Sequence, residues 1–254
     1  MVKRLGILNI WVDPISMDEA LRRAADHVES GDRPHAIFAS NPEKNFSVPR
    51  DPLLYKIFKN ADILIPDGIG IVLAARLLYG TRISRVPGVE LMHKICEMSA
   101  ARGYKIFVYG AKEEVNRASV ERLKQLYPGL NIVGRANGYI QEDEMAELVE
   151  RINASGAQIL FLALGSPKQE KWYASHKDEL THLRVCQGIG GTLDTVIGNV
   201  KRAPRFWRAI GLEWFYRLIS DPKRVKRQKV LPVFAAQILL EKLGALNSSN
   251  RGVK

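Results

Sequence analysis

The residues of this 254-residue chain that could do chemistry gather where its apolar runs end. Asp67 is the clearest case, because it follows the apolar run "ADILIP" and precedes a segment that resembles the start of a helix. A carboxylate in that position can cap a helix, and it can also act as a general base at the edge of a pocket. Pro66 and Gly68 on either side favour a tight, exposed turn. The local sequence alone leaves both roles open.

Glycines, amides and a few other polar residues follow the remaining apolar runs in the same way. They let a backbone approach a ligand closely, and they offer amide hydrogen bonds. Each of them alone is also an ordinary turn residue, but their recurrence after six runs indicates a shared binding edge. The candidate binding residues are Asn41, Gly68, Tyr109, Gly110, Asn137, Gly138, Gly165, Pro167, Lys168, Gln169, Gly188 and Gly190.

Other common kinds of site do not fit this sequence. Leu73 stands where the dinucleotide fingerprint needs its third glycine, which disfavours a nucleotide-dependent oxidoreductase, and no Walker A lysine pattern occurs. "GIGGTLD" could hold a pyrophosphate on backbone amides, although this signal is weak alone. The five histidines lack metal-ligand spacing and no D-x-D follows an apolar run, so we expect no metal site.

Strand-like apolar runs alternate with amphipathic segments along the chain. Ser16 and Glu19 form a capping-box pattern at one helix start, and Gly80 is a plausible helix stop. We expect strands or a hairpin in 3–12, 35–40, 62–66, 104–110, 131–138, 157–165 and 184–191. We expect helices in 16–30, 51–61, 68–80, 88–103, 112–128, 143–156 and 166–180. This alternation predicts an α/β fold, with a mostly parallel sheet, helices on both faces and ligands beyond the carboxyl ends of the strands.

The charge of the chain is unevenly distributed. The formal net charge is +11, and residues 201–254 hold 13 Lys and Arg against 3 Asp and Glu, so the first 200 residues are almost neutral. We therefore divide the chain into a core, 1–200, and a basic C-terminal appendage, 201–254. Two distant cysteines, a poor signal peptide and the lack of a long apolar stretch predict a cytoplasmic protein.

The basic appendage is also rich in aromatic residues. Helical spacing would place Phe206, Ile210, Trp214 and Leu218 along one stripe, which is typical of an amphipathic helix at an anionic membrane surface. A helix packed on the core with a solvated basic face is the alternative. Nucleic-acid binding is disfavoured by the near-neutral core and by the lack of a known nucleic-acid module.

Six segments in this order resemble the WecG/TagA/CpsF glycosyltransferases over about residues 5–240. They are "SNPEKN", "ADILIPDGIGIV", "RVPGVELM", "LGSPKQEKW", "GIGGTLDTVIGNVKRAP" and "GLEWFYRLISDPKRVKRQ". The resemblance implies a Rossmann-like fold with a C-terminal appendage that meets the membrane. It implies inverting, metal-independent transfer of a sugar, often N-acetylmannosamine or its uronic acid, from a UDP donor to an undecaprenyl-diphosphate-linked sugar. The enzyme would lie on the inner face of the cell membrane and need no cofactor.

The family motifs assign roles to single positions. Asp67 matches the proposed base, Arg85 and Asn41 match pocket residues, and Gln169 matches the glutamine of "PKQE". Arg85 and the glycines of "GIGG" are then candidates to stabilise the departing diphosphate. The appendage offers further cations in Arg217, Arg224 and Arg227.

One position departs from the family pattern. Ala39 replaces a threonine that often precedes the asparagine by two residues, and the side chain of Ser40 would point to the other face of its strand. The competing function is that of a non-enzymatic nucleotide or nucleic-acid-binding protein that uses its basic tail. The sequence identifies neither the transferred sugar nor the oligomeric state.

Overall fold

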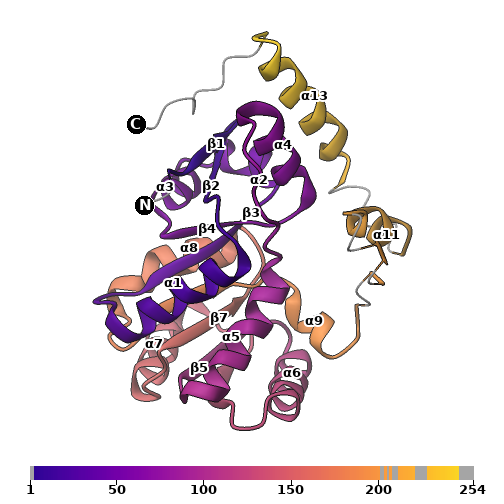
Figure 1. Cartoon of the computed structure of the whole chain (residues 1–254). Helices are drawn as coiled ribbons and strands as arrows, with labels where there is room; N and C mark the ends of the chain where they lie inside the picture. The colour runs from indigo at the N-terminus through magenta and orange to yellow at the C-terminus, as the bar shows by residue number, and fades with distance from the viewer. Residues whose placement is uncertain (1–2, 201–202, 205, 208–210, 221–227, 246–254) are drawn as a thin grey trace.

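The computed structural model describes residues 3–200, 203–204, 206–207, 211–220 and 228–245 (Figure 1). Its centre is a six-stranded sheet in the order β4-β3-β8-β7-β5-β6, and every pair of neighbouring strands is parallel. The strands are β3 (His35–Ser40), β4 (Ile63–Pro66), β5 (Lys105–Gly110), β6 (Asn131–Ala136), β7 (Ile159–Ala163) and β8 (Val185–Gly188). The predicted parallel α/β sheet is confirmed.

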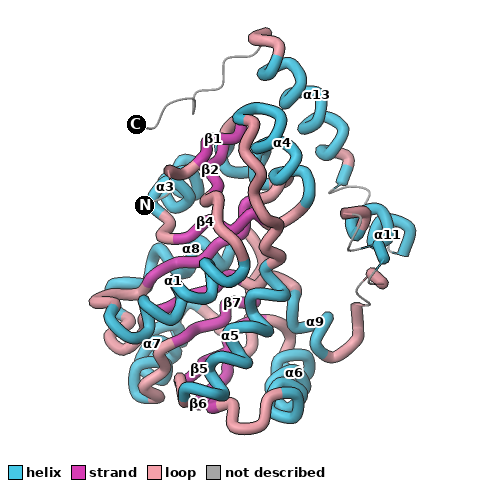
Figure 2. The backbone as a smooth tube through the Cα atoms, in the orientation of Figure 1, coloured by secondary structure: helices cyan, strands magenta, loops and turns pink. Residues whose placement is uncertain are grey.

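Helices cover both faces of this sheet, as Figure 2 shows. One face packs on α3 (Pro52–Asn60), α4 (Ile69–Tyr79), α7 (Met145–Ala154) and α8 (Lys168–His176). The other face packs on α1 (Met17–Ser30), α5 (Gly88–Arg102), α6 (Glu113–Leu126) and α9 (Thr192–Val196). Alternating strand residues serve the two layers, since Phe107 and Tyr109 join the first core while Ile106 and Val108 join the second.

Several local predictions are confirmed by the backbone. Ser16 is the N-cap of α1 and accepts a hydrogen bond from the Glu19 amide. Gly80 ends α4 in the left-handed conformation, with φ of 66°. The first predicted element is an antiparallel hairpin of β1 (Leu5–Ile7) and β2 (Ile10–Val12).

Short elements fill the loops between the longer ones. They are α2 (Lys44–Ser47) and the 3-10 helices η1 (Val48–Arg50), η2 (Glu142–Glu144) and η3 (Lys177–Glu179). Their few residues carry too little periodicity to be predicted from sequence, and the same is true of α9.

In Figure 1 α13 (Val230–Lys242) lies beside α4, and the described C-terminal residues also contain α11 (Glu213–Ser220). Phe234 and Ile238 of α13 are buried in the core that also contains Ile71 and Ala74 of α4. The proposed domain boundary at residue 200 stays a prediction. No helix in these described stretches is both long and apolar enough to cross a membrane.

The predicted aromatic stripe along one helix is wrong. Gly211 adopts a positive φ of 77° and α11 begins only at Glu213, so Phe206 and Trp214 do not lie on one continuous helix. A Cβ added at Gly211 would lie 2.9 Å from Ile69 Cγ1. The turn at Gly211 therefore packs closely against the start of α4. Ile210 lies outside the described residues.

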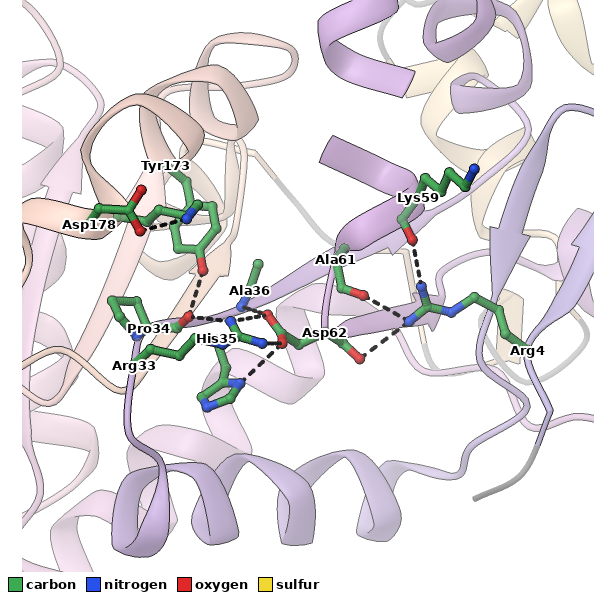
Figure 3. Close-up of polar contacts among 11 residues, drawn as sticks. Arg4, Arg33, Pro34, His35, Ala36, Lys59, Ala61, Asp62, Tyr173 and Asp178 are labelled. Atoms are coloured by element: carbon green, nitrogen blue, oxygen red, sulfur yellow. Dashed lines mark hydrogen bonds and ion pairs between the residues drawn. The ribbon is translucent and has the colours of Figure 1, made fainter. Parts of the chain in front are cut away.

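Polar contacts tie the amino ends of β3 and β4 together, at the edge opposite the predicted site (Figure 3). Asp62 accepts hydrogen bonds from the Ala36 amide at 2.8 Å and from Arg33 Nη2 at 2.6 Å, and its carboxylate lies 3.1 Å from His35 Nδ1. Burial tends to raise the pKa of Asp62, but Arg33, Ala36 and His35 outweigh it and hold that pKa below its ordinary value.

Candidate active site

Asp67 lies at the carboxyl end of β4, next to the end of β3. Its amide donates to the Ser40 carbonyl at 3.0 Å, which ties the two strand ends together. The N-cap residue of α4 is Gly68, so Asp67 stands one position before the cap, and the interpretation of Asp67 as the N-cap is wrong. Gly68 has φ of 109°, a conformation that favours glycine, and it turns the chain sharply after the carboxylate. Asp67 therefore lies in the turn between β4 and α4.

Arg85 is brought to the same strand end by the segment that precedes α5. The amide of Val86 donates to the Pro66 carbonyl at 2.9 Å, which fixes this segment beside β4. The guanidinium of Arg85 pairs with the carboxylate of Glu213, with Nη1 and Oε2 separated by 3.3 Å. Glu213 is the first residue of α11, so the C-terminal segment contacts a predicted catalytic residue directly. No motif suggested this contact.

Asn41 follows β3 and forms a turn with Lys44. Asn41 Oδ1 accepts a hydrogen bond from the Lys44 amide, three residues on, at 3.1 Å, and the Asn41 carbonyl accepts from the same amide at 3.0 Å. Ser40 is fully buried and donates its hydroxyl to the Trp11 carbonyl, so that hydroxyl faces the core and does not replace the family's threonine. The prediction that Ser40 points away from the Ala39 side of the strand is confirmed.

Gln169 links the ends of β7 and β8. Its Oε1 accepts a hydrogen bond from the Gly190 amide at 3.0 Å, so this amide of the glycine loop is engaged within the protein. A Cβ at Gly188 would come within 2.5 Å of Gln169 Nε2, so glycine is needed there for the glutamine to fit. Gly165, Pro167 and Lys168 form the turn into α8 that sets the position of Gln169.

The ends of β5 and β6 hold the remaining candidates. Gly110 packs on the backbone of Ala163, and Gly138 donates its amide to Ala111 at 2.7 Å. Asn137 lines a hollow of about 330 Å³ together with Glu113, Arg135, Ala136, Ile140 and Arg151. Tyr109 instead packs its ring against Trp172 in the core, and burial raises its pKa to about 12. Its side chain therefore does not reach the edge with the others.

The sheet order divides the candidates into two groups. Asp67 and Asn41 follow β4 and β3, Gly188 ends β8, and Gln169 lies in the helix after β7. These four strands are successive in the sheet. Asn137 follows β6, five strand spacings from β4, or roughly 24 Å at about 4.8 Å per strand. A ligand that used both groups would have to be elongated and lie across the sheet edge.

The appendage arginines are placed only in part. Arg217 belongs to α11, while Arg224 and Arg227 lie outside the described residues. In the parts of the chain that the structure describes, no three His, Cys, Asp or Glu side chains form a group able to hold a metal ion.

Comparison with known proteins decides the family. Residues 5–248, nearly the whole chain, match the sequence profile of the "Glycosyl transferase WecG/TagA/CpsF family". The chain belongs to this glycosyltransferase family. The resemblance inferred from the six motifs is thereby confirmed.

Two curated relatives of this glycosyltransferase are similar over most of their length. One, from Bacillus spizizenii, is 34% identical over 203 residues, which cover 80% of this chain and 78% of the relative. The other, from Bacillus subtilis, is 34% identical over 205 residues, which cover 81% and 79%. Both are named N-acetylglucosaminyldiphosphoundecaprenol N-acetyl-beta-D-mannosaminyltransferase.

Three residues near the glycosyltransferase's candidate site were missed by sequence reasoning. Glu213 pairs with Arg85, and Lys44 forms a buried ion pair with Glu170 at 2.6 Å. All three lie inside the segments that carry the family resemblance. Only the fold shows which of these charged side chains form ion pairs.

Proposed function

We propose that this enzyme transfers N-acetylmannosamine, or a related hexose, from a UDP-sugar to a sugar linked to undecaprenyl diphosphate. The names of the two relatives support this acceptor class and the transferred sugar. The structural observation that carries the proposal is the position of Asp67. Asp67 lies in a sharp turn at the carboxyl end of β4. Asn41 and Arg85 lie beside it, on adjoining segments.

In this proposal Asp67 acts as the general base. It takes the proton from the acceptor hydroxyl as the hydroxyl oxygen attacks C1 of the donor sugar from the face opposite the UDP leaving group. The anomeric centre is inverted, the bond from C1 to the diphosphate oxygen breaks, and UDP leaves with the bonding electrons. Positioning of the two substrates supplies much of the rate.

The donor would lie along the sheet edge, which explains why candidates gather after so many strands. We place the sugar over β3 and β4, near Asn41 and Asp67, and the diphosphate near Arg85. The uridine would extend along the edge toward the ends of β8 and β7, where Gly188 and Gln169 lie. Arg85, assisted by cations of the appendage, would stabilise the charge of the departing diphosphate without a metal ion.

We further propose that the enzyme binds peripherally to the inner face of the cell membrane, because its acceptor is lipid-linked. Exposed apolar side chains gather on the described C-terminal helices. They are Trp214, Phe215 and Ile219 on α11 and Val233, Leu239 and Leu240 on α13, followed by Leu243. The 13 Lys and Arg of residues 201–254 would add attraction to anionic headgroups.

The direct test is UDP release from a panel of UDP-sugars, with a lipid-diphosphate-linked N-acetylglucosamine as acceptor. We expect UDP-N-acetylmannosamine to be turned over fastest. Asp67→Asn should fold normally and lose about 10²-fold or more in kcat, as for a lost general base. Asp178→Asn, an exposed carboxylate at the opposite edge, is the matched control. Near-parental turnover by Asp67→Asn would refute the assignment, and a salt-dependent shift of nucleic acid without UDP-sugar turnover would favour the binding-protein alternative.

A further inference from the structure

A buried ion pair lies beneath the candidate site. Lys44 Nζ is 2.6 Å from Glu170 Oε1, and the two side chains are 8% and 1% exposed. Lys44 begins α2, after β3, while Glu170 lies in the first turn of α8, after β7. Because β8 separates these two strands in the sheet, the pair joins loops that are not neighbours in the sheet.

The same pair is bonded to residues that the site needs. Lys44 donates its backbone amide to Asn41 Oδ1 and its ammonium group to the Ser166 hydroxyl. Glu170 Oε1 is also 3.5 Å from Gln169 Nε2, and the other end of that amide accepts from Gly190. A continuous polar network therefore runs from the loop after β3, through the loop after β7, to the loop after β8.

The orientation of Gln169 is fixed by this network. Its oxygen faces the Gly190 amide, while its nitrogen faces Glu170 and the space that a side chain at Gly188 would fill. Gln169 is 6% exposed, so little room is left for another rotamer. If Glu170 moves, or if Lys44 no longer holds it, the Gln169 amide nitrogen loses this polar partner.

Stability alone is a weak reason to keep such a pair. Desolvation of two charges can cost more than their attraction returns, and replacement of a buried pair by apolar side chains of similar size is often neutral or stabilising. The second carboxylate oxygen, Glu170 Oε2, is buried without a hydrogen-bond partner among the described residues, which adds to that cost. The ring of Phe58 lies 4.9 Å from Lys44 Nζ, so an apolar side chain at position 44 would have an aromatic neighbour.

We propose that Lys44 and Glu170 are positioning residues for sugar transfer, which hold the Gln169 amide and the Asn41 turn in the geometry that the donor sugar requires. This inference rests on the proposed function. Neither side chain needs to touch a substrate, because their effect passes through Gln169 and Asn41. Small displacements of such groups can cost about 10²-fold in rate.

The test compares single and double replacements of the pair. Lys44→Met and Glu170→Met each leave one buried charge without its partner, so each should lower the melting temperature. The double variant Lys44→Met/Glu170→Met should melt within about 4 °C of the parent, because no lone charge remains. Its kcat should nevertheless fall about 10²-fold, while the Kd for UDP changes less than about threefold. Parental kcat in the folded double variant would overturn the proposal.

A conservative variant covers the case in which the double variant does not fold. Lys44→Arg keeps the charge but moves the donors, so it should melt near the parental temperature and lose at least about tenfold in kcat. Parental kcat in Lys44→Arg would then contradict the positioning role.

The double variant Arg33→Met/Asp62→Asn is the control. It removes an ion pair at the opposite edge and should leave kcat unchanged. If the parent releases no UDP from any UDP-sugar, the proposed function fails, and this outcome is separate from failure of the positioning role.

Discussion

Arg85 and Glu213, which lie 128 positions apart in the sequence, form an ion pair in which the guanidinium and carboxylate are 3.3 Å apart. Their side chains are 21% and 11% exposed, so the pair is partly shielded from water. The sequence predicts that the C-terminal segment brings cations to the site, yet the contact that the structure describes brings a carboxylate to the arginine. A donor diphosphate that binds Arg85 must compete with this carboxylate.

Glu213→Gln is therefore expected to strengthen UDP binding. A partly exposed ion pair is worth about 1 kcal/mol, so removal of the competing charge should lower the Kd for UDP about fivefold. Arg85→Gln should instead raise that Kd by about tenfold or more, because the proposed charge-assisted contact to the diphosphate would be lost. Isothermal titration calorimetry with UDP measures both. Glu97→Gln, an exposed change on α5, serves as the control, and weaker UDP binding by Glu213→Gln would contradict the competition.

Gly188→Ala should impair the enzyme through Gln169. The added Cβ would lie 2.5 Å from Gln169 Nε2 and 3.0 Å from the Phe38 ring, so the amide must move. We expect kcat/KM to fall by at least about tenfold, with an overpacking cost of about 1–3 kcal/mol in the free energy of unfolding. Gly88→Ala is the matched control, because its Cβ would meet Ile65 Cδ1 at 3.7 Å, an ordinary van der Waals contact. Equal activities of the two variants would show that Gln169 need not stay in place.

Asp62→Asn should change how stability depends on pH. The pKa of Asp62 is lowered in the folded protein, so the carboxylate contributes stability above its unfolded pKa of about 4. That contribution is lost as the pH falls through the lowered folded pKa. We expect Asp62→Asn to lose about 1–2 kcal/mol in the free energy of unfolding at pH 7, and the difference from the parent to shrink below about pH 4. Urea unfolding at several pH values measures this, with Asp178→Asn as the control. A difference in the free energy of unfolding between Asp62→Asn and the parent that stayed constant down to pH 3 would contradict the prediction.

Buried and exposed residues in and just after α13 should respond differently to substitution. Phe234 is 4% exposed and packs toward α4, so Phe234→Ala should cost about 3 kcal/mol in the free energy of unfolding. Leu243, just beyond α13, is 80% exposed, so Leu243→Gln should leave stability unchanged but weaken sedimentation with phosphatidylglycerol vesicles several-fold. Unchanged sedimentation of Leu243→Gln combined with Leu239→Gln would exclude this surface from membrane binding.

The longer elements could be predicted because local chemistry and burial agree there. The apolar runs of β3, β5 and β7 are buried strands, and caps such as Ser16 and Gly80 act within one turn of the residues they serve. The row of candidates at the sheet edge follows from the same pattern, because parallel strands bring their carboxyl ends to one edge.

What could not be predicted depends on contacts between distant segments. Helical spacing suggested one stripe from Phe206 to Leu218, but Gly211 breaks it where the backbone meets Ile69. Tyr109 ends a strand, as expected, yet it faces Trp172 because its place in the strand puts it on the core side. The ion pairs of Arg85 and Lys44 join positions more than a hundred residues apart, and no local pattern encodes such a partner.

The order of the strands also determines when the activity can arise during synthesis. β3, which precedes Asn41, is bordered by β4 on one side and by β8 on the other, and β8 is the last strand of the sheet along the chain. Because the amino-terminal part leaves the ribosome first, Asp67 and Asn41 emerge well before Gly190, which holds Gln169. An unfinished chain therefore carries Asp67 without the complete strand-end edge around it. We expect a chain that stops before β8 to lack transferase activity.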